Sequence, residues 1–209
     1  MNTLEHLLRK IVASEVLHQR WLETLSHLEH CGARKIHRLQ VPGRVPLALL
    51  QHAAEEARHA LLFKLFSGKL GGAAPQASQL LGLPLGKRYL DVLDLWVSRQ
   101  LRHHLRVNKE HCPHACYLLT TLVIEKRAEQ LYPLYEQILQ ESGASFSLQE
   151  IIREETQHLK LINRQIAAVP GLQAMVGAAL DYEETLFQRW LVQLGYCCAN
   201  SSSLIHPTL

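Results

Sequence analysis

Several features that mark other protein classes are scarce or absent in this sequence. Aromatic residues make up only 6% of the 209 residues, and no segment shows the apolar-polar alternation typical of β-strands. No apolar run approaches the roughly 18 uncharged residues that suggest a transmembrane helix. The formal net charge is only +3 and the basic residues are spread along the chain, so charge identifies no nucleic-acid-binding segment and excludes none. We therefore expect neither a sheet nor a membrane span.

The cysteine content and the first residues both bear on location. Five cysteines are an odd number, which does not suggest a framework of disulfides. The N-terminal segment MNTLEHLLRKIVASEVLHQRW carries charges throughout, whereas a secretory signal has an apolar core and a cleavage site. These features favour a reducing, cytoplasmic location.

Helix-forming residues are abundant. The 47% apolar fraction comes mostly from Leu, Ala and Val, mixed with Glu, Gln, Lys and Arg. Helical spacing of apolar residues predicts helices over 3–39, 46 to 68 or 71, 88–105, 113–140, 148–168 and 172–196, with Pro46 opening the second and Ser147 with Glu150 as a capping box before the fifth. The Gly-, Pro- and Ser-rich segment 69–87 separates two helical hairpins.

This order of elements predicts an all-α fold. A hairpin, a long crossover, a second hairpin and a covering helix are the sequence of a four-helix bundle with one long crossover plus additional helices. We expect a single helical domain over residues 1–198, followed by a flexible C-terminal tail over 199–209.

Two stretches share the pattern Glu-Glu-x-x-His: EEARH at 55–59 and EETQH at 154–158. Residues three apart share one face of a helix, so Glu56 with His59, and Glu155 with His158, can each offer two ligands to one cation. Both pairs fall on apolar faces, and a buried carboxylate without a compensating charge costs several kcal/mol. Either a metal ion or a network of buried polar side chains must compensate, and the 13 histidines favour a metal.

Di-iron and di-manganese bundles complete such a site with one inward glutamate from each of the other two helices. Glu125 in LVIEKRAEQLY lies on an apolar face, 30 residues before Glu155 (155 − 125). In the first helix, two antiparallel helices that turn near Gly43 would bring position 29 to the depth of Glu56 and His59, which favours Glu29. Glu23 is rotated away from that face and is the alternative.

The stretches LEHCGA at 28–33, EEARH, VIEKRAEQ at 123–130 and EETQH together resemble the ferritin-like diiron carboxylate superfamily. Within it, LVIEKRAEQLY followed by Glu155 is similar to the third and fourth helices of the tRNA hydroxylases that oxidise a prenylated, methylthiolated adenosine. The resemblance implies a ferritin-like bundle with two iron ions, for which manganese is an alternative. It implies bridging by Glu56 and Glu155, terminal ligation by Glu29 and Glu125, and one imidazole per ion from His59 and His158.

The resemblance also implies an activity. The chain would be an O2-activating diiron oxidoreductase, a hydroxylase or monooxygenase, with O2, an electron-donating reductase and a modified tRNA nucleoside as partners, no membrane association, and a monomeric or small oligomeric state. Tyr132 or Tyr135, a turn or more beyond Glu125, would trap radicals or donate hydrogen bonds to the ligands. The alternatives are an iron-handling ferroxidase or iron-binding protein, and a metal-free helical interaction module.

Two further segments have competing interpretations. EHCPHAC at 110–116 gathers His and Cys as zinc sites do, but it lacks Cys-x2-Cys spacing and is expected to be the start of a helix. RQLRHHLR at 99–106 would contact RNA phosphates in a tRNA hydroxylase, or form a solvated helix face.

Overall fold

The computed structural model describes residues 3–39, 45–104 and 112–200, and all regular structure in these ranges is helical. Two elements, η1 (Ala77–Gln79) and η2 (Gln173–Met175), are short 3-10 helices. The α-helices within the described ranges are α1 (Thr3–Val12), α2 (Glu15–His37), α3 (Leu47–Lys69), α4 (Leu83–His104), α5 (Cys112–Glu141), α6 (Gln149–Ala167) and α7 (Val176–Asn200). The all-α prediction is confirmed for the part of the chain that the structure describes.

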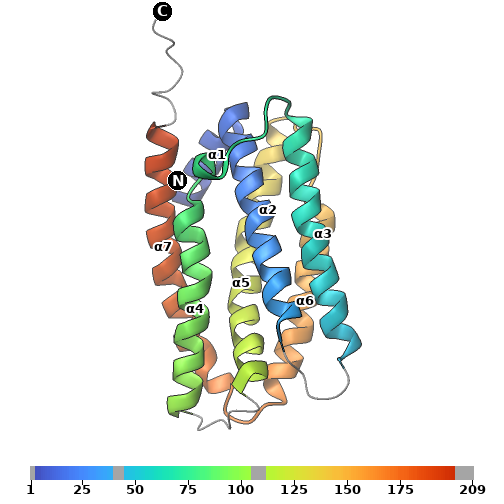
Figure 1. Cartoon of the computed structure of the whole chain (residues 1–209), viewed down its shortest axis with the longest axis vertical. Coiled ribbons are helices and arrows are strands. Elements are labelled where there is room, and N and C mark those ends of the chain that lie inside the picture. Colours follow the sequence, from blue (N-terminus) through green and yellow to red (C-terminus); the bar gives the residue numbers. More distant parts are fainter. Residues whose placement is uncertain (1–2, 40–44, 105–111, 201–209) are drawn as a thin grey trace, which may run out of the picture.

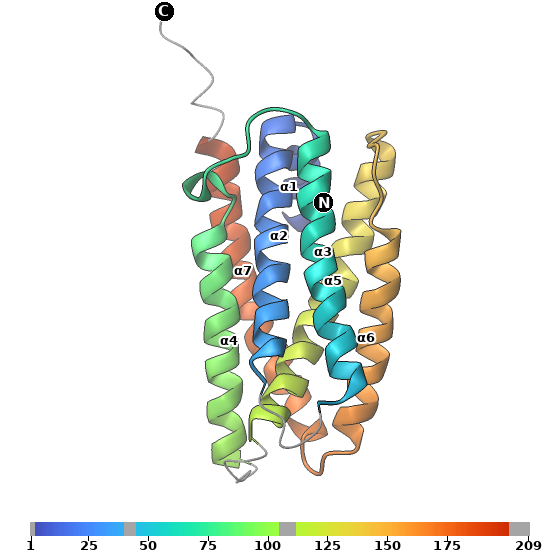
Figure 2. The same ribbon diagram turned by 45° about the vertical axis from the view of Figure 1, so that its right-hand side comes forward.

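The long helices lie side by side, and neighbours along the chain run in opposite directions (Figure 1). Helix α2 packs along α3, and α5 packs along α6. Helices α4 and α7 pack against each other and against α5, on the side away from α3 and α6 (Figures 1 and 2). Four helices, α2, α3, α5 and α6, thus surround a shared interior that α4 and α7 cover on one side.

The first predicted helix is wrong in one respect, because the segment 3–39 is two helices and not one. The chain leaves helical geometry at Ser14, whose φ of −125° and ψ of 112° are extended. The Ser14 hydroxyl accepts a hydrogen bond from the Leu17 backbone N–H at 3.4 Å, which caps the N-terminus of α2. The break lets α1 turn away and pack against α5 and α7 as well as α2.

The predicted capping box at the start of α6 is also wrong. Leu148, not Ser147, is the N-cap residue, and its backbone N–H donates to the buried carboxylate of Glu136 at 2.6 Å. The Ser147 hydroxyl donates to Glu136 as well, at 2.8 Å. Glu150 pairs with Arg58 on α3, so it does not reach back to the helix start.

Other boundaries lie near their predicted positions. Pro46 precedes α3 as expected, and α4 begins at Leu83, inside the predicted crossover, which also contains η1. Helix α7 continues through residues 199 and 200, so the predicted tail is helical at its start, and the rest of it lies outside the described residues. The predicted turn near Gly43 also lies outside them.

Charged side chains occur in the interior of this apolar bundle. Acidic residues are almost never fully buried unless they are paired. Buried Glu183 has such a partner, because Arg127 donates to its carboxylate from Nε at 2.8 Å and from Nη2 at 2.7 Å.

Within the described residues, no helix combines the length and the apolar composition that a membrane span requires.

Candidate metal centre

The structure brings together the six side chains that sequence predicts as ligands. Each of the four inner helices contributes: Glu29 from α2, Glu56 and His59 from α3, Glu125 from α5, and Glu155 and His158 from α6. Within the described residues, two groups of four have ligand atoms that all lie within 4.8 Å of one another. One group, set A, is Glu29, Glu56, His59 and Glu155; the other, set B, is His52, Glu56, Glu125 and His158.

Two carboxylates lie between the two sets. Glu56 belongs to both sets; its Oε1 is 3.7 Å from His158 Nδ1, and its Oε2 faces α2, where a Cβ added to Gly32 would be 3.1 Å away. Glu155 Oε1 is 3.0 Å from His59 Nδ1, and its Oε2 is 3.4 Å from His158 Nδ1. Each carboxylate therefore presents one oxygen to each side of the cluster, as a bridging ligand does.

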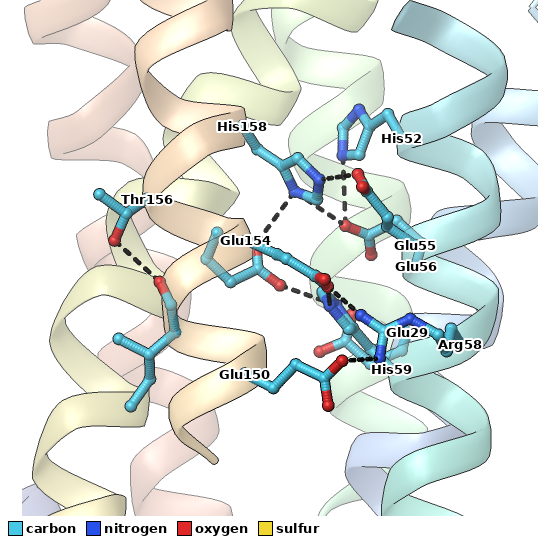
Figure 3. Close-up of polar contacts among 12 residues, drawn as sticks. Glu29, His52, Glu55, Glu56, Arg58, His59, Glu150, Glu154, Thr156 and His158 are labelled. Atoms are coloured by element: carbon cyan, nitrogen blue, oxygen red, sulfur yellow. Dashed lines mark hydrogen bonds and ion pairs between the residues drawn. The ribbon is translucent and has the colours of Figure 1, made fainter.

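The two predicted histidines are held by the first glutamate of the opposite motif. His59 Nε2 is 2.8 Å from Glu154 Oε2, and His158 Nε2 is 2.7 Å from Glu55 Oε2 (Figure 3). The Nδ1 atom of each ring is buried, faces the cluster and makes no hydrogen bond. Metal-binding histidines have this arrangement, with one nitrogen toward the ion and the other on a carboxylate.

Sequence reasoning missed three residues that contact the cluster directly or hold its histidines: His52, Glu55 and Glu154. His52 is buried and lies four residues before Glu56, on the same face of α3, which is the signal that would have found it. Glu55 and Glu154 are the first residues of the two repeated motifs, and this repetition is the signal that would have found them. They are only partly buried and point across to the other helix.

The structure separates the two candidates on α2. Glu29, which is partly buried, lies in set A, whereas Glu23 belongs to neither set and forms an ion pair with Lys64 of α3. Tyr132 donates a hydrogen bond to Glu29. The Tyr135 hydroxyl instead lies 2.6 Å from His18 Nε2, and His18 belongs to neither set.

Burial and mutual repulsion perturb the acids. Burial and the charge of Glu155 raise the pKa of Glu125 to about 8, and burial with the charges of Glu56 and Glu155 raises the pKa of Glu29 well above its usual value. Burial alone would raise the pKa of Glu155, but its contacts with Glu125, His158 and His59 lower it. Burial opposes protonation of His158, but the carboxylates of Glu125 and Glu155 raise its pKa to about 12. Protons and a divalent cation therefore compete for the same atoms.

A cavity of about 890 Å³ adjoins the cluster. The cluster residues on its wall are Glu29, His52, Glu56, Glu125 and Glu155. Much of the remaining wall is apolar, including Leu25, Leu28, Ile124, Leu131 and Phe187. Charged side chains also line it, namely Lys35, Arg38, Arg102, Arg127, Asp91 and Asp94. An organic molecule could occupy this space beside the ligand atoms.

The described residues of the two competing segments, 99–104 and 112–116, belong to neither set. Cys112 and Cys116 lie in the first turns of α5, as expected for a helix start, while His111 lies outside the described residues. Cys116 Sγ is 3.6 Å from Asp94 Oδ1 on α4. Residues 99–104 form the end of α4, and 105–106 lie outside the described part of the chain.

No protein-family model, curated protein or solved structure matches this chain. Its function is therefore inferred from the chemistry of the cluster and of the cavity beside it.

Proposed function

We propose that this cluster binds two iron ions, with manganese as the alternative, and that the chain is an O2-dependent diiron oxidoreductase with a ferritin-like bundle. In this proposal the enzyme is a hydroxylase or monooxygenase whose favoured substrate is a modified tRNA nucleoside. Glu56 and Glu155 would be shared by the two ions, Glu29 and Glu125 would each be a further carboxylate ligand, and His59 and His158 would each bind one ion.

The observation that carries the proposal is the pair of buried Nδ1 atoms without hydrogen bonds. Both face the cluster while Glu154 and Glu55 hold the opposite nitrogens. Each Nδ1 atom instead faces carboxylate oxygens at 3.0 to 3.7 Å, and a cation at the cluster would lie between the nitrogens and these oxygens.

The charges support the same conclusion. Elsewhere in the interior, Glu183 is matched by Arg127 and Glu23 by Lys64, while Glu136 accepts hydrogen bonds from Ser147 and the Leu148 N–H. Within the described residues, the ion pairs of Glu56, Glu125 and Glu155 are all with histidine rings. Together with Glu29 these acids supply four carboxylates, whose charge two divalent ions would balance. Carboxylate and imidazole ligands suit iron or manganese.

The chain's own residues would divide the remaining tasks. Iron bound at the two positions would supply the electrons that activate O2. The cavity would hold the substrate against Glu29, Glu125 and His52, and its apolar wall would exclude water from that contact. Tyr132 would hold its hydroxyl proton on Glu29 and fix the orientation of that carboxylate.

The cations that line the cavity support the tRNA substrate. Lys35 and Arg38 lie near the carboxyl end of α2, and Arg102 lies near the carboxyl end of α4. These two helix ends lie at the same end of the molecule (Figures 1 and 2). Lys35 forms ion pairs with Asp91 and Asp94, so phosphate groups of an RNA chain would pair with Arg38 and Arg102 while an apolar base modification entered the cavity.

The activity is tested by loading the metal-free chain anaerobically with Fe(II) and then admitting O2. The proposal expects bound iron whose oxidation changes the electronic absorption of the protein. The absence of such a change in an iron-loaded chain would contradict the proposal.

For the substrate, nucleosides of tRNA from a deletion strain are compared by mass spectrometry with those of the parent. A hydroxylated nucleoside should disappear, and unchanged hydroxylation would remove the tRNA assignment.

Iron handling is the competing function, since a ferroxidase would use the same ligands. The large apolar cavity beside the cluster favours an organic substrate, because iron oxidation alone needs only a path for ions and O2. Iron storage also requires a cage of many subunits, so light scattering separates the two. A particle of about 24 chains would favour storage, and a monomer or small oligomer favours the oxygenase.

A further inference from the structure

We propose that His52 is a seventh metal ligand, so that one of the two metal positions takes two imidazoles and the other takes one. The inference rests on the proposed metal centre and goes beyond it. Set B would bind its ion with His52, His158, Glu56 and Glu125, and set A would bind its ion with Glu29, Glu56, His59 and Glu155. The second oxygen of Glu155 would also reach the ion of set B. The two positions then differ in chemistry as well as in place.

The position of the His52 ring supports ligation. The residue is 4% exposed, and its Nε2 atom is 3.2 Å from Glu56 Oε1 and 3.2 Å from Glu125 Oε1. Metal bonds of about 2.1 Å at right angles place neighbouring ligand atoms about 3.0 Å apart. His158 Nδ1 completes the group at 3.5 Å from the same oxygen of Glu125. These separations match ligands arranged around one ion.

The other nitrogen of His52 has a partner of its own. Nδ1 is 2.8 Å from the Tyr117 hydroxyl on α5. With Nδ1–H donating to the phenol oxygen, the lone pair of Nε2 points at the carboxylates, as a ligand requires. His52 thus presents Nε2 to the cluster, whereas His59 and His158 present Nδ1 and are held by carboxylates. A neutral phenol polarises the ring less than a carboxylate does, so His52 would be the weaker ligand.

The alternative role for His52 is that of a charged partner. A protonated ring could pair with Glu56 and Glu125 and remain so when the ions bind. The two roles differ in one countable quantity, the number of imidazoles bound to metal. Ligation by His52 gives three imidazoles for two ions, from His52, His59 and His158, and the ion-pair role gives two.

The consequence is unequal metal preference. With Glu56 and Glu155 each presenting an oxygen to both sides, each position has three carboxylates, but set A has one imidazole and set B has two. Imidazole suits cobalt and zinc relatively better, while carboxylate suits manganese relatively better. Mixed loading should therefore place cobalt in set B and manganese in set A.

X-ray absorption spectroscopy of the cobalt-loaded full chain tests the proposal, because the scattering from imidazole rings gives their number per metal. We expect three imidazoles for two cobalt ions in the wild-type protein and two in His52→Gln. His18→Gln is the matched control, since His18 is also buried but bonds Tyr135 outside the cluster, and it should keep the wild-type number. Circular dichroism checks that each variant remains helical.

The outcomes distinguish the two proposals. A wild-type chain that binds no cobalt would overturn the metal centre and the role of His52 together. A wild-type chain that binds two cobalt ions with two imidazoles would overturn the role of His52 alone, and this result needs no variant to fold. Tyr117→Phe gives a second measure: it should weaken cobalt binding at one position about 10-fold or more and leave the other unchanged.

Discussion

At the scale of single residues, each of the two Glu-Glu-x-x-His motifs holds the histidine of the other in place. The second glutamate and the histidine of each motif face the cluster, and the first glutamate holds the histidine of the other helix. This pairing between the helices determines which ring nitrogen faces the cluster. Each fixed residue of the motif therefore has a physical role.

Glu55→Gln and Glu154→Gln should each weaken metal binding about 10- to 100-fold, because the amide holds the imidazole less well in its ligand orientation. Binding is measured by competition with a chelator of known affinity. Glu150→Gln is the matched control, since Glu150 and Glu154 both pair with Arg58 but Glu150 contacts neither histidine. Equal affinity of Glu154→Gln and the control would contradict the orienting role.

Gly32 leaves room for a carboxylate. A methyl group there would lie 3.1 Å from Glu56 Oε2, which is closer than ordinary van der Waals contact. Gly32→Ala should therefore displace Glu56 and lower metal affinity, as the same competition assay would show. Gly68→Ala on α3 meets nothing within 4 Å and should leave affinity unchanged. Wild-type affinity in Gly32→Ala would show that Glu56 does not need this space.

We expect His18 to make the free energy of unfolding depend on pH, independently of the cluster. Burial lowers its pKa to about 4, below the value of about 6.5 in an unfolded chain. The unfolded state therefore binds more protons between these values, and the wild type should lose up to about 3 kcal/mol as pH falls from 6.5 to 4. Urea unfolding of His18→Gln should show a shallower loss over this window. Parallel curves for the two proteins would contradict the assignment.

Sequence alone identified six side chains that the structure brings together, because helical spacing and depth along antiparallel helices are simple geometry. Glu29 was preferred to Glu23 on depth, and the structure places Glu29 in set A. His52 was missed because the expected pattern required one histidine per helix. The roles of Glu55 and Glu154 depend on side chains reaching between helices, which spacing along one helix does not show.

At the scale of elements, sequence predicted which segments are helical more accurately than where helices end. Apolar spacing continues across Ser14, so it predicted one helix where two exist. Ser147 has the sequence of an N-cap, but Leu148 is the N-cap residue, and the distant Glu136 accepts a hydrogen bond from its N–H. Helix ends depend on which partner satisfies the last backbone groups, and that partner can be far along the chain.

The cap at Ser14 makes a prediction about α2. Ser14→Ala removes the acceptor for the Leu17 N–H and should reduce the free energy of unfolding by about 1 kcal/mol. Ser14→Asp keeps an acceptor at the same place and should retain the wild-type stability. Both are measured by urea unfolding, and equal stability of Ser14→Ala and the wild type would show that the hydroxyl does not cap α2.

At the scale of the whole molecule, the cluster joins four helices, α2, α3, α5 and α6, through charged side chains. Ions bound by α2, α3, α5 and α6 at once would stabilise the folded state relative to the unfolded one. Their binding would displace protons from groups such as Glu125, whose pKa is raised to about 8. Metal affinity should therefore fall as the pH is lowered, because protons then compete for the ligands.

The most direct test of the metal centre is an anaerobic titration of the metal-free chain with Fe(II), with bound iron counted after removal of free metal. Two tightly bound ions per chain are expected for the wild type. Fewer are expected for Glu56→Ala, since Glu56 belongs to both sets. A folded wild-type chain that retains no iron, or a Glu56→Ala variant that retains two ions with unchanged affinity, would contradict a dinuclear centre built on these helices.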